Sequence, residues 1–289
     1  MLQQVINGIS VGAVYALIAV GFALIFNILK FSNFSHGGVM TVSAYFGYYL
    51  ASEFHTTLFA TLALTALFGG LMAVAIEFVA FRSIRNNNGP LIYYFVSSIT
   101  VGMLLENIIT IFKGSTFYAY TTLANNEVVN ISGASISAMN LLMLVISCGM
   151  LLVLMWVIMK TRLGIAVRAA SFDVNTSKLM GMNTTQIISV TFFVSGLLAG
   201  ISGVFLGISY TLYPQLGQMV VKGWIASVLG GLGSLGGAVL GAFILGIVEV
   251  YLVSTVGAGL SSVFIFLLTL IFLIVRPQGI AGNVVREKA

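Results

Sequence analysis

Three glutamates lie within apolar runs of the sequence, where a carboxyl group could carry a proton or face water. Glu77 stands close to the end of its run and near Arg82, so we expect its side chain either to snorkel to the membrane surface or to pair with Arg82 there. Glu106 and Glu249 lie deeper, about two helical turns or roughly 10 Å from the ends of their runs. An ionised side chain inside a membrane costs about 2.5–3.5 kcal/mol on insertion scales, so such residues indicate function by default. Both could line a water-filled pathway; the alternative is a carboxyl held by Tyr, Ser or Thr of neighbouring helices.

Two breaks in the apolar pattern carry the other candidate pathway residues. Asn33 and His36 lie in NFSHGG, between the first two runs, and Gly233 and Gly237 lie in a glycine-rich stretch near the other end of the chain. Interrupted helices of this kind line binding sites in membrane transporters. The alternatives are close helix packing for the glycines and a structural hydrogen bond for His36. One histidine makes no metal site, so we expect no metal.

Motifs of catalysis are absent from the sequence. It contains no GxxxxGK[ST] phosphate loop, no HExxH and no GxSxG. The single cysteine, Cys148, lies in an apolar run and offers neither a disulfide nor a metal framework. We therefore expect a protein that is not an enzyme and holds no cofactor; if ATP drives it, ATP binds to another subunit.

Charged residues gather in one segment, 160–183, with the sequence KTRLGIAVRAASFDVNTSKLMGMN. Its apolar residues recur at helical spacing and form one stripe, and its polar residues form a second stripe. The apolar stripe is Ile165, Ala169, Phe172, Thr176 and Leu179, and the polar stripe is Arg168, Ser171, Asn175 and Lys178. Asp173 is a suitable N-cap and Gly181 a suitable stop, which predicts two short helices joined near 171–173.

The apolar stripe of this amphipathic segment needs a surface to rest on. The membrane surface, or a hinge to the chain's own helices, is one interpretation. The other is docking into a groove on a soluble partner subunit, which would transmit its movement through this segment. On the second interpretation Ala169 and Phe172 enter the groove, Arg168 and Lys178 meet charges at its rim, and Asp173 and Gly181 shape the two helices.

Composition places these residues on membrane helices. Hydrophobic residues make up 59% of the 289 residues and charged residues only 7%, against about 25% charged in soluble domains. Lipid offers the backbone no hydrogen-bond partners, so the spans must be helices or a closed barrel, and uninterrupted apolar runs of about 20 residues favour helices. The sequence predicts an all-α, polytopic membrane protein forming one domain over residues 1–289. The net charge of +5 indicates orientation in the membrane and no affinity for nucleic acid.

Nine runs are candidate crossings. They are Val5–Ile28, Val39–Leu50, Leu58–Phe81, Leu91–Phe112, Asn140–Met159, Gln186–Tyr210, Pro214–Leu235, Ala238–Val256 and Val263–Val275. Pro214–Leu235 is interrupted by glycines and is expected to be short or broken. The count is nine if this segment crosses and eight if it or the N-terminal part is re-entrant.

Basic residues set the orientation. With the 160–183 segment in the cytoplasm, Arg82, Arg85 and the C-terminal Arg286 are cytoplasmic too, and the N-terminus is outside. Ten of the twelve Lys and Arg then face the cytoplasm. Lys113 and Lys222 are the exceptions.

Glycines at helical spacing form smooth faces on several predicted spans. Gly196, Gly200, Gly203 and Gly207 follow one another at steps of three or four residues, Gly233, Gly237 and Gly241 do the same, and Gly8 and Gly12 form a third face. Small residues let helix backbones approach closely in lipid. Close packing is the expected role, with lining of the pathway as the alternative for the broken segment.

Six motifs in order carry a family resemblance over about residues 5–282. They are NGISVGAVYALIAVGFALIFNI, NFSHG, IEFVAFRSIR, the segment RLGIAVRAASFDVNTSKLMGMNTTQIISVTF, KGWIASVLGGLGSLGGAVLGAFILGIVEV and RPQGIAG. With them the chain resembles the LivH-type inner-membrane permeases of ABC importers for branched-chain amino acids. Permeases for urea or short amides, or for sugars, have a similar architecture and are the alternatives within transport.

The resemblance implies a bacterial cytoplasmic (inner) membrane importer. Its other members would be a second permease subunit (a copy or a relative of this chain), two cytoplasmic ABC ATPases that bind ATP, and an external substrate-binding protein. It also implies that residues 160–183 form the coupling loop contacted by an ATPase. An ion-coupled carrier acting alone, with Glu106 or Glu249 carrying protons, is the alternative from another class.

Overall fold

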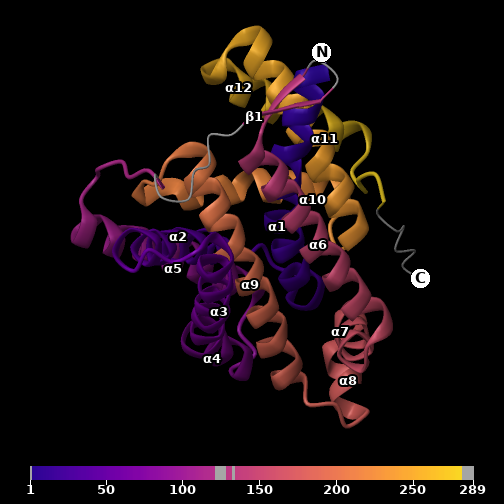
Figure 1. Ribbon diagram of the computed structural model, residues 1–289. Coiled ribbons are helices and arrows are strands. Elements are labelled where there is room, and N and C mark those ends of the chain that lie inside the picture. Colours follow the sequence, from indigo (N-terminus) through magenta and orange to yellow (C-terminus); the bar gives the residue numbers. More distant parts are fainter. Residues whose placement is uncertain (1, 121–127, 132–133, 282–289) are drawn as a thin grey trace. The chain divides into compact units, whose positions relative to one another are not determined.

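The computed structural model describes residues 2–120, 128–131 and 134–281 of the chain, and helices dominate it (Figure 1). The first half contains α1 (Leu2–Leu29), α2 (Ser35–Glu53), α3 (Leu58–Ile76), a π-helix η1 (Glu77–Phe81), α4 (Arg82–Asn86) and α5 (Leu91–Lys113). A hairpin of β1 (Val128–Ile131) and β2 (Ala134–Ser137) follows, and then α6 (Ala138–Lys160), α7 (Arg162–Phe172), α8 (Val174–Leu179) and α9 (Thr184–Tyr210). The last elements are a 3-10 helix η2 (Pro214–Met219), α10 (Val220–Gly230), α11 (Leu235–Val256) and α12 (Ala258–Val275).

The predicted all-α membrane architecture is confirmed. Within the described residues, seven helices are long and apolar enough to cross a membrane: α1, the continuous α3–η1–α4, α5, α6, α9, α11 and α12. The two remaining predicted crossings are helical as well, as α2 and as η2–α10, but they are not among these seven, and the count of eight or nine crossings stays a prediction. Between α5 and α6, the described residues contain the β1–β2 hairpin, which the sequence did not predict.

The predicted breaks lie where expected. The α10 helix has 11 residues, which at about 1.5 Å per residue cover roughly half of a 30 Å hydrocarbon core. It ends at a turn in which Gly231 and Gly233 have φ values of 107° and 95°, a conformation that favours glycine. Gly233 therefore belongs to this turn and not to the helical glycine face predicted for it. At the other break, Lys30 has a φ of 57° and separates α1 from α2.

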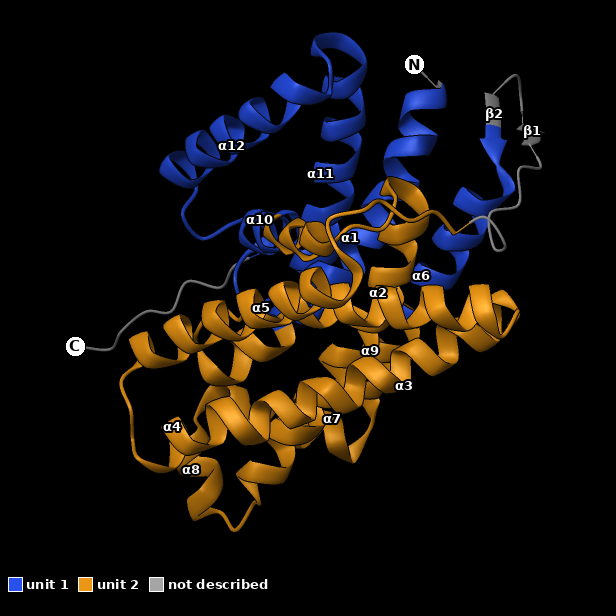
Figure 2. Ribbon diagram, turned by 90° about the vertical axis from the view of Figure 1, so that its left-hand side faces the viewer, with its two compact units in different colours: residues 1–23, 126–151, 222–289 blue, residues 24–125, 152–221 orange. Residues whose placement is uncertain are grey.

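The chain divides into two compact units, coloured separately in Figure 2. Unit 1 comprises residues 1–23, 126–151 and 222–289, and unit 2 comprises residues 24–125 and 152–221. The boundaries fall within α1, α6 and α10. The prediction of one domain over residues 1–289 stays a prediction.

Unit 2 is organised around α9, which packs against α3 and α2. A Cβ on Gly200 would meet the backbone of Thr65 and lie 2.9 Å from the Ala66 Cα atom. Gly196 likewise faces the backbone of Gly69. The glycine face of α9 thus serves close helix packing, as predicted, and holds the middle of α9 against α3.

Unit 1 contains the α10–α11 hairpin and α12 (Figure 2). Gly8 and Gly12 of α1 face the backbone of α11, where a Cβ on Gly12 would lie 2.9 Å from the Phe243 Cα atom. Within the hairpin, Gly237 approaches the Gly230 backbone. These glycines also serve packing. The predicted basic tail with Arg286 lies outside the described residues.

Candidate functional site: the 160–183 segment and the charged groups of the spans

The 160–183 segment folds as two short helices, as predicted. Thr161 caps α7, its hydroxyl oxygen accepting a hydrogen bond from the Gly164 N–H at 3.2 Å. Asp173 ends α7 and caps α8: its Oδ1 accepts from the Asn175 N–H at 2.8 Å and the Thr176 N–H at 3.3 Å. The hydrogen bond from the Thr176 hydroxyl, together with these two backbone bonds, holds the pKa of Asp173 below its usual value. Asp173 alone is thus the joint between the two helices.

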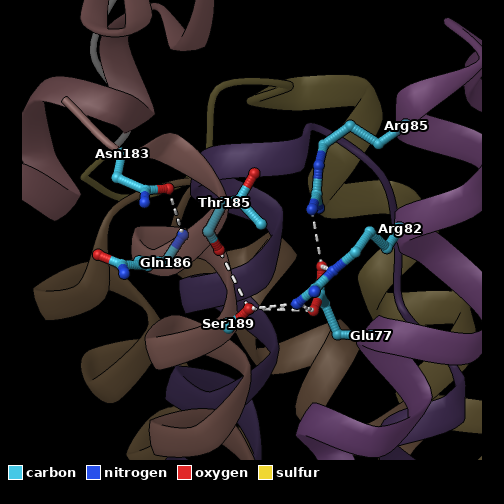
Figure 3. Close-up of polar contacts among 7 residues, drawn as sticks. All are labelled: Glu77, Arg82, Arg85, Asn183, Thr185, Gln186 and Ser189. Carbon is cyan, nitrogen blue, oxygen red and sulfur yellow. Dashed lines mark hydrogen bonds and ion pairs between the residues drawn. The ribbon is translucent and has the colours of Figure 1, made fainter. Parts of the chain in front are cut away.

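A cap in the left-handed region ends α8. Gly181 has a φ of 82°, and its N–H donates to the Lys178 carbonyl at 3.1 Å. Asn183 then caps α9, because its Oδ1 accepts from the Gln186 N–H at 3.2 Å (Figure 3). The second short helix is thus connected to α9 by four residues, 180–183, and the predicted helix stop at Gly181 is confirmed.

Small residues fasten α7 to its own chain. Gly164 lies against the Ile158 carbonyl at the end of α6, and Ala170 is buried. The Arg168 guanidinium donates to the Ile158 and Met159 carbonyls at 2.9 and 3.3 Å. A cation on the last carbonyls of a helix is favoured by the helix dipole. Arg168 thus ties α7 to α6, a contact that the sequence did not predict.

An apolar cavity lies beneath α7, between it, the C-terminal part of α6 and the N-terminal half of α9. Its lining residues are Leu24, Leu154, Val157, Ile158, Leu163, Gly164, Val167, Val190, Thr191 and Val194. The side of α7 that faces the protein is therefore the side of Gly164, Val167 and Ala170. It is a different side from the predicted apolar stripe.

The predicted apolar stripe faces outward. Phe172 is 94% exposed, Leu179 86% and Ile165 57%, while Ala169 is half-buried. Met180 adds a further exposed side chain. In the described part of the chain, this stripe therefore does not pack against other helices. The interpretation of the stripe as a hinge to the chain's own helices is wrong. The stripe is a free apolar face, with Lys178 exposed beside it.

Glu77 is the centre of a buried polar network in unit 2 (Figure 3). Its side chain is fully buried, and its two oxygens accept from Arg82 Nη2 at 2.7 Å and from Arg85 Nη2 at 2.8 Å. The predicted pairing with Arg82 is confirmed, and Arg85 is a second partner. Ser189 of α9 lies 3.0 Å from both the Glu77 carboxylate and Arg82 Nη2. The network therefore joins η1 and α4 to the second turn of α9.

The π-helix explains how Arg82 reaches Glu77. In an α-helix, a residue five positions further on points about 140° away. The π-turn closes an i→i+5 hydrogen bond, here from the Arg82 N–H to the Glu77 carbonyl, and so brings the two side chains to the same side. Insertions of this kind often occur at functional sites. No sequence pattern used above could have found it.

The break before α2 is filled by its own polar residues. Asn33 Oδ1 accepts from the Ser35 N–H at 3.2 Å and from the Ser35 hydroxyl at 2.6 Å. His36 Nδ1 lies 3.2 Å from the Ser195 hydroxyl of α9. Asn33 and His36 are both only 3% exposed. The structural hydrogen bond is therefore present for His36, and a pathway role for the two residues stays a prediction.

The two deeper glutamates belong to different units. Glu106 of α5 is half-buried in unit 2 and forms a side-chain hydrogen bond with Gln218 of η2. Glu249 of α11 lies in unit 1 and is 6% exposed. The shared water-filled pathway predicted for them stays a prediction.

Lys222 is the partner of Glu249, and the sequence missed this pair. Lys222 Nζ lies 2.5 Å from Glu249 Oε1 and 3.0 Å from the Tyr15 hydroxyl. The alternative prediction was a carboxyl group held directly by Tyr, Ser or Thr, and it is wrong for Glu249 Oε1. This oxygen contacts Lys222, and Tyr15 contacts Lys222 in turn. A signal was available: Lys222 was an exception to the charge rule and stood in a span.

Comparison with known proteins identifies the family. Residues 4–273 match the family model described as branched-chain amino acid transport system / permease component. BraD of Pseudomonas aeruginosa, a high-affinity branched-chain amino acid transport system permease protein, is 32% identical over 99% of this chain and 97% of its own. LivH of Escherichia coli K12, which bears the same description, is 33% identical over the same shares.

The fold has a solved counterpart. An inward-facing structure described as a metal-chelate type ABC transporter matches 94% of this chain and 85% of its own with a TM-score of 0.55 and 15% identity. This likeness concerns the fold alone. The sequence comparisons go further, and they show that the chain, a multi-pass membrane protein, belongs to the family of branched-chain amino acid transport system permease components.

Proposed function

We propose that this protein is a membrane-spanning permease subunit of an ATP-driven importer that carries branched-chain amino acids across a bacterial cytoplasmic membrane. Family membership supports the substrate class, since the relatives in Pseudomonas and Escherichia bear that description. The chain contributes the path through the membrane and no catalytic group. Its partners are a second permease subunit, two cytoplasmic ATPases that bind ATP, and an external substrate-binding protein.

The free apolar face of α7–α8 carries the proposal that ATPases act on this chain. Phe172 and Leu179 are 94% and 86% exposed, although Thr161, Asp173 and Asn183 cap α7, α8 and α9 with side-chain hydrogen bonds. An exposed apolar face on a rigid helix pair is suited to a groove on a partner. The sequence has no phosphate loop of its own, so the energy of ATP must enter through such a contact.

Movement of the docked segment would reach the spans by two connections. Arg168 and Gly164 fasten α7 to the end of α6. On the other side, α8 continues into α9, whose Ser189 belongs to the Glu77 network. A tilt of α7–α8 would thus move α6 and α9 together. We propose Arg168, Ala169, Phe172, Asp173, Lys178 and Gly181 as coupling residues, and Asn33, His36, Glu106, Glu249, Gly233 and Gly237 as pathway residues.

Transport by the reconstituted complex tests this function. Proteoliposomes containing the chain with its permease partner, its ATPases and the binding protein should accumulate leucine, isoleucine and valine only when ATP is present on the ATPase side. Liposomes containing the permease chains alone should not. Uptake by the permease chains alone, driven by a proton or sodium gradient, would instead identify an ion-coupled carrier, and uptake of urea, an amide or a sugar in place of leucine would reject the substrate class.

A further inference from the structure

The ion pair of Lys222 and Glu249 lies within the helices of unit 1. Glu249 is the fifteenth residue of α11, about 21 Å along the helix from its first residue, which places it well inside a hydrocarbon core of about 30 Å. Lys222 stands near the start of α10. Charges at such positions are expensive and mark binding sites or ion pathways by default.

One oxygen of this carboxylate is unused. Glu249 Oε1 contacts Lys222, whereas Oε2 is buried and accepts no hydrogen bond from any residue that the structure describes. A buried carboxylate oxygen without a donor is unfavourable, since nearly all such groups in folded proteins are paired. Glu249 Oε2 can therefore accept a hydrogen bond from a cationic donor that is not part of the chain.

An α-amino acid carries an ammonium group and a carboxylate. These two charges can replace the contact that Lys222 and Glu249 make with each other. We propose that Lys222 and Glu249 form a binding site for the zwitterionic head of the transported amino acid, a proposal that rests on the function proposed above. The ammonium group binds the Glu249 carboxylate, and the carboxylate of the substrate binds Lys222 Nζ. In the empty site the two side chains neutralise each other. In the occupied site each faces the opposite charge of the ligand, so no buried charge is left unpaired in either state.

Tyr15 contacts Lys222 independently of Glu249, and this contact can persist when the ligand binds. Its hydroxyl accepts from Lys222 Nζ at 3.0 Å, and the cation lies 5.4 Å from the centroid of the Tyr15 ring. A cation in this position is attracted to the face of an aromatic ring. Lys222 therefore keeps a favourable contact when it parts from Glu249, and its side chain, 22% exposed against 8% for Glu249, is the more accessible of the two.

The α10–α11 hairpin carries Lys222 and Glu249, and hydrogen bonds fasten its turn at some distance from this pair. The N–H groups of Ile280 and Ala281 donate to the carbonyls of Leu229 and Gly230, each at 2.9 Å, at the turn between α10 and α11. Lys222 lies eight residues before Gly230, or about 12 Å along α10. A small tilt of α10 about its fastened end would thus separate Lys222 from Glu249 and admit the head group.

Leucine uptake by the complete importer in proteoliposomes tests the site. Lys222→Met, Glu249→Gln and the double variant should each lower uptake about tenfold or more, because each removes a charge-assisted contact to the substrate. Assembly with the ATPases and docking of the binding protein should persist in the double variant. Ser254→Ala is the matched control: it removes the hydrogen bond of 2.9 Å between Gln4 and Ser254, which also joins α1 to α11, and should leave uptake within about twofold of wild type.

The double variant separates a binding site from a structural ion pair. Replacing both partners of a buried pair by neutral groups is often neutral for stability. A purely structural pair would therefore regain wild-type uptake in Lys222→Met/Glu249→Gln, and that result overturns the proposal. If the wild-type importer takes up no branched-chain amino acid, the proposed function fails first, whatever the variants do.

A second measurement needs no variant and so does not depend on folding. Photo-leucine, which keeps the zwitterionic head and carries a diazirine in its side chain, is bound to the wild-type importer and activated by light. Mass spectrometry should find its label on peptides of α10, α11 or the part of α1 around Tyr15, and excess leucine should suppress it. Saturable labelling confined to other helices would contradict a site at Lys222 and Glu249.

Discussion

Replacing Glu77 by glutamine should destabilise unit 2 strongly although it changes one polar atom. The carboxylate is fully buried and accepts from Arg82 at 2.7 Å, from Arg85 at 2.8 Å and from Ser189 at 3.0 Å. In Glu77→Gln the charge disappears, and one acceptor becomes an NH2 group that faces guanidinium donors. The two arginines then lack their counterion.

The magnitude follows from burial. Breaking a buried ion pair by removing one partner costs about 3–5 kcal/mol, against about 0–1 kcal/mol for an exposed pair. The Arg82 and Arg85 side chains are 27% and 17% exposed, so water relieves part of the loss. We therefore expect Glu77→Gln to lower the free energy of unfolding by about 3 kcal/mol, at the lower end of the buried range.

Unfolding in mixed micelles with increasing SDS, followed by circular dichroism, measures this effect. Glu53→Gln is the control, because Glu53 is exposed at the end of α2 and should change the free energy by less than about 0.5 kcal/mol. Ser189→Ala should cost about 1 kcal/mol, and its effect should shrink in the Glu77→Gln background because both residues belong to one network. A Glu77→Gln protein as stable as the Glu53→Gln control would refute the network as the connection between η1, α4 and α9.

Three further predictions concern packing, capping and coupling. Gly200→Ala should lower the free energy of unfolding by about 2 kcal/mol because its Cβ meets the backbone of α3. Gly149→Ala, whose Cβ would have nothing within 4 Å, should be neutral or stabilise the protein by up to about 1 kcal/mol. Equal effects of the two variants in SDS unfolding would contradict the close approach of α9 to α3. The lowered pKa of Asp173 means that its cap protects the α8 amides from hydrogen exchange fully above the ordinary aspartate pKa. This protection is lost as the pH falls through the lowered pKa. Asp173→Ala should abolish this acid dependence of hydrogen exchange, and a dependence that persists in the variant would count against the cap. Ala169→Trp should overfill the partner's groove, so that substrate-stimulated ATP hydrolysis falls while the binding protein still docks; normal stimulated hydrolysis would argue against docking there.

Local rules sufficed for the parts of the fold that depend on near neighbours in the chain. Asp173 and Gly181 were predicted as cap and stop because each acts on residues within one turn. The glycine faces of α9 and α1 were predicted as packing surfaces from their spacing alone. The pairing of Glu77 with Arg82 was also local, since five residues separate them.

Contacts that depend on tertiary geometry were missed. Lys222 and Glu249 are 27 residues apart, and their meeting depends on how α10 folds back on α11 at the Gly231 turn. The buried side of α7 was missed for another reason: Gly164 and Ala170 are small, so they add little to an apolar stripe, yet they allow the close contact with α6. The π-turn at Glu77 has no signature in the hydrophobic pattern.

Association of the ATPases with a Phe172→Asp variant tests the central claim most directly. Phe172 is 94% exposed, so the change costs the chain itself little, whereas truncating an aromatic anchor at an interface costs about 2 kcal/mol or more. The affinity of the ATPases for the permease in nanodiscs should fall about thirtyfold or more, and stimulated ATP hydrolysis should fall with it. Phe54→Asp, at an exposed aromatic residue that follows α2 and lies outside the 160–183 segment, should leave both unchanged. If Phe172→Asp retains wild-type ATPase affinity and wild-type stimulated hydrolysis, the α7–α8 face is not where ATP-driven movement enters this protein.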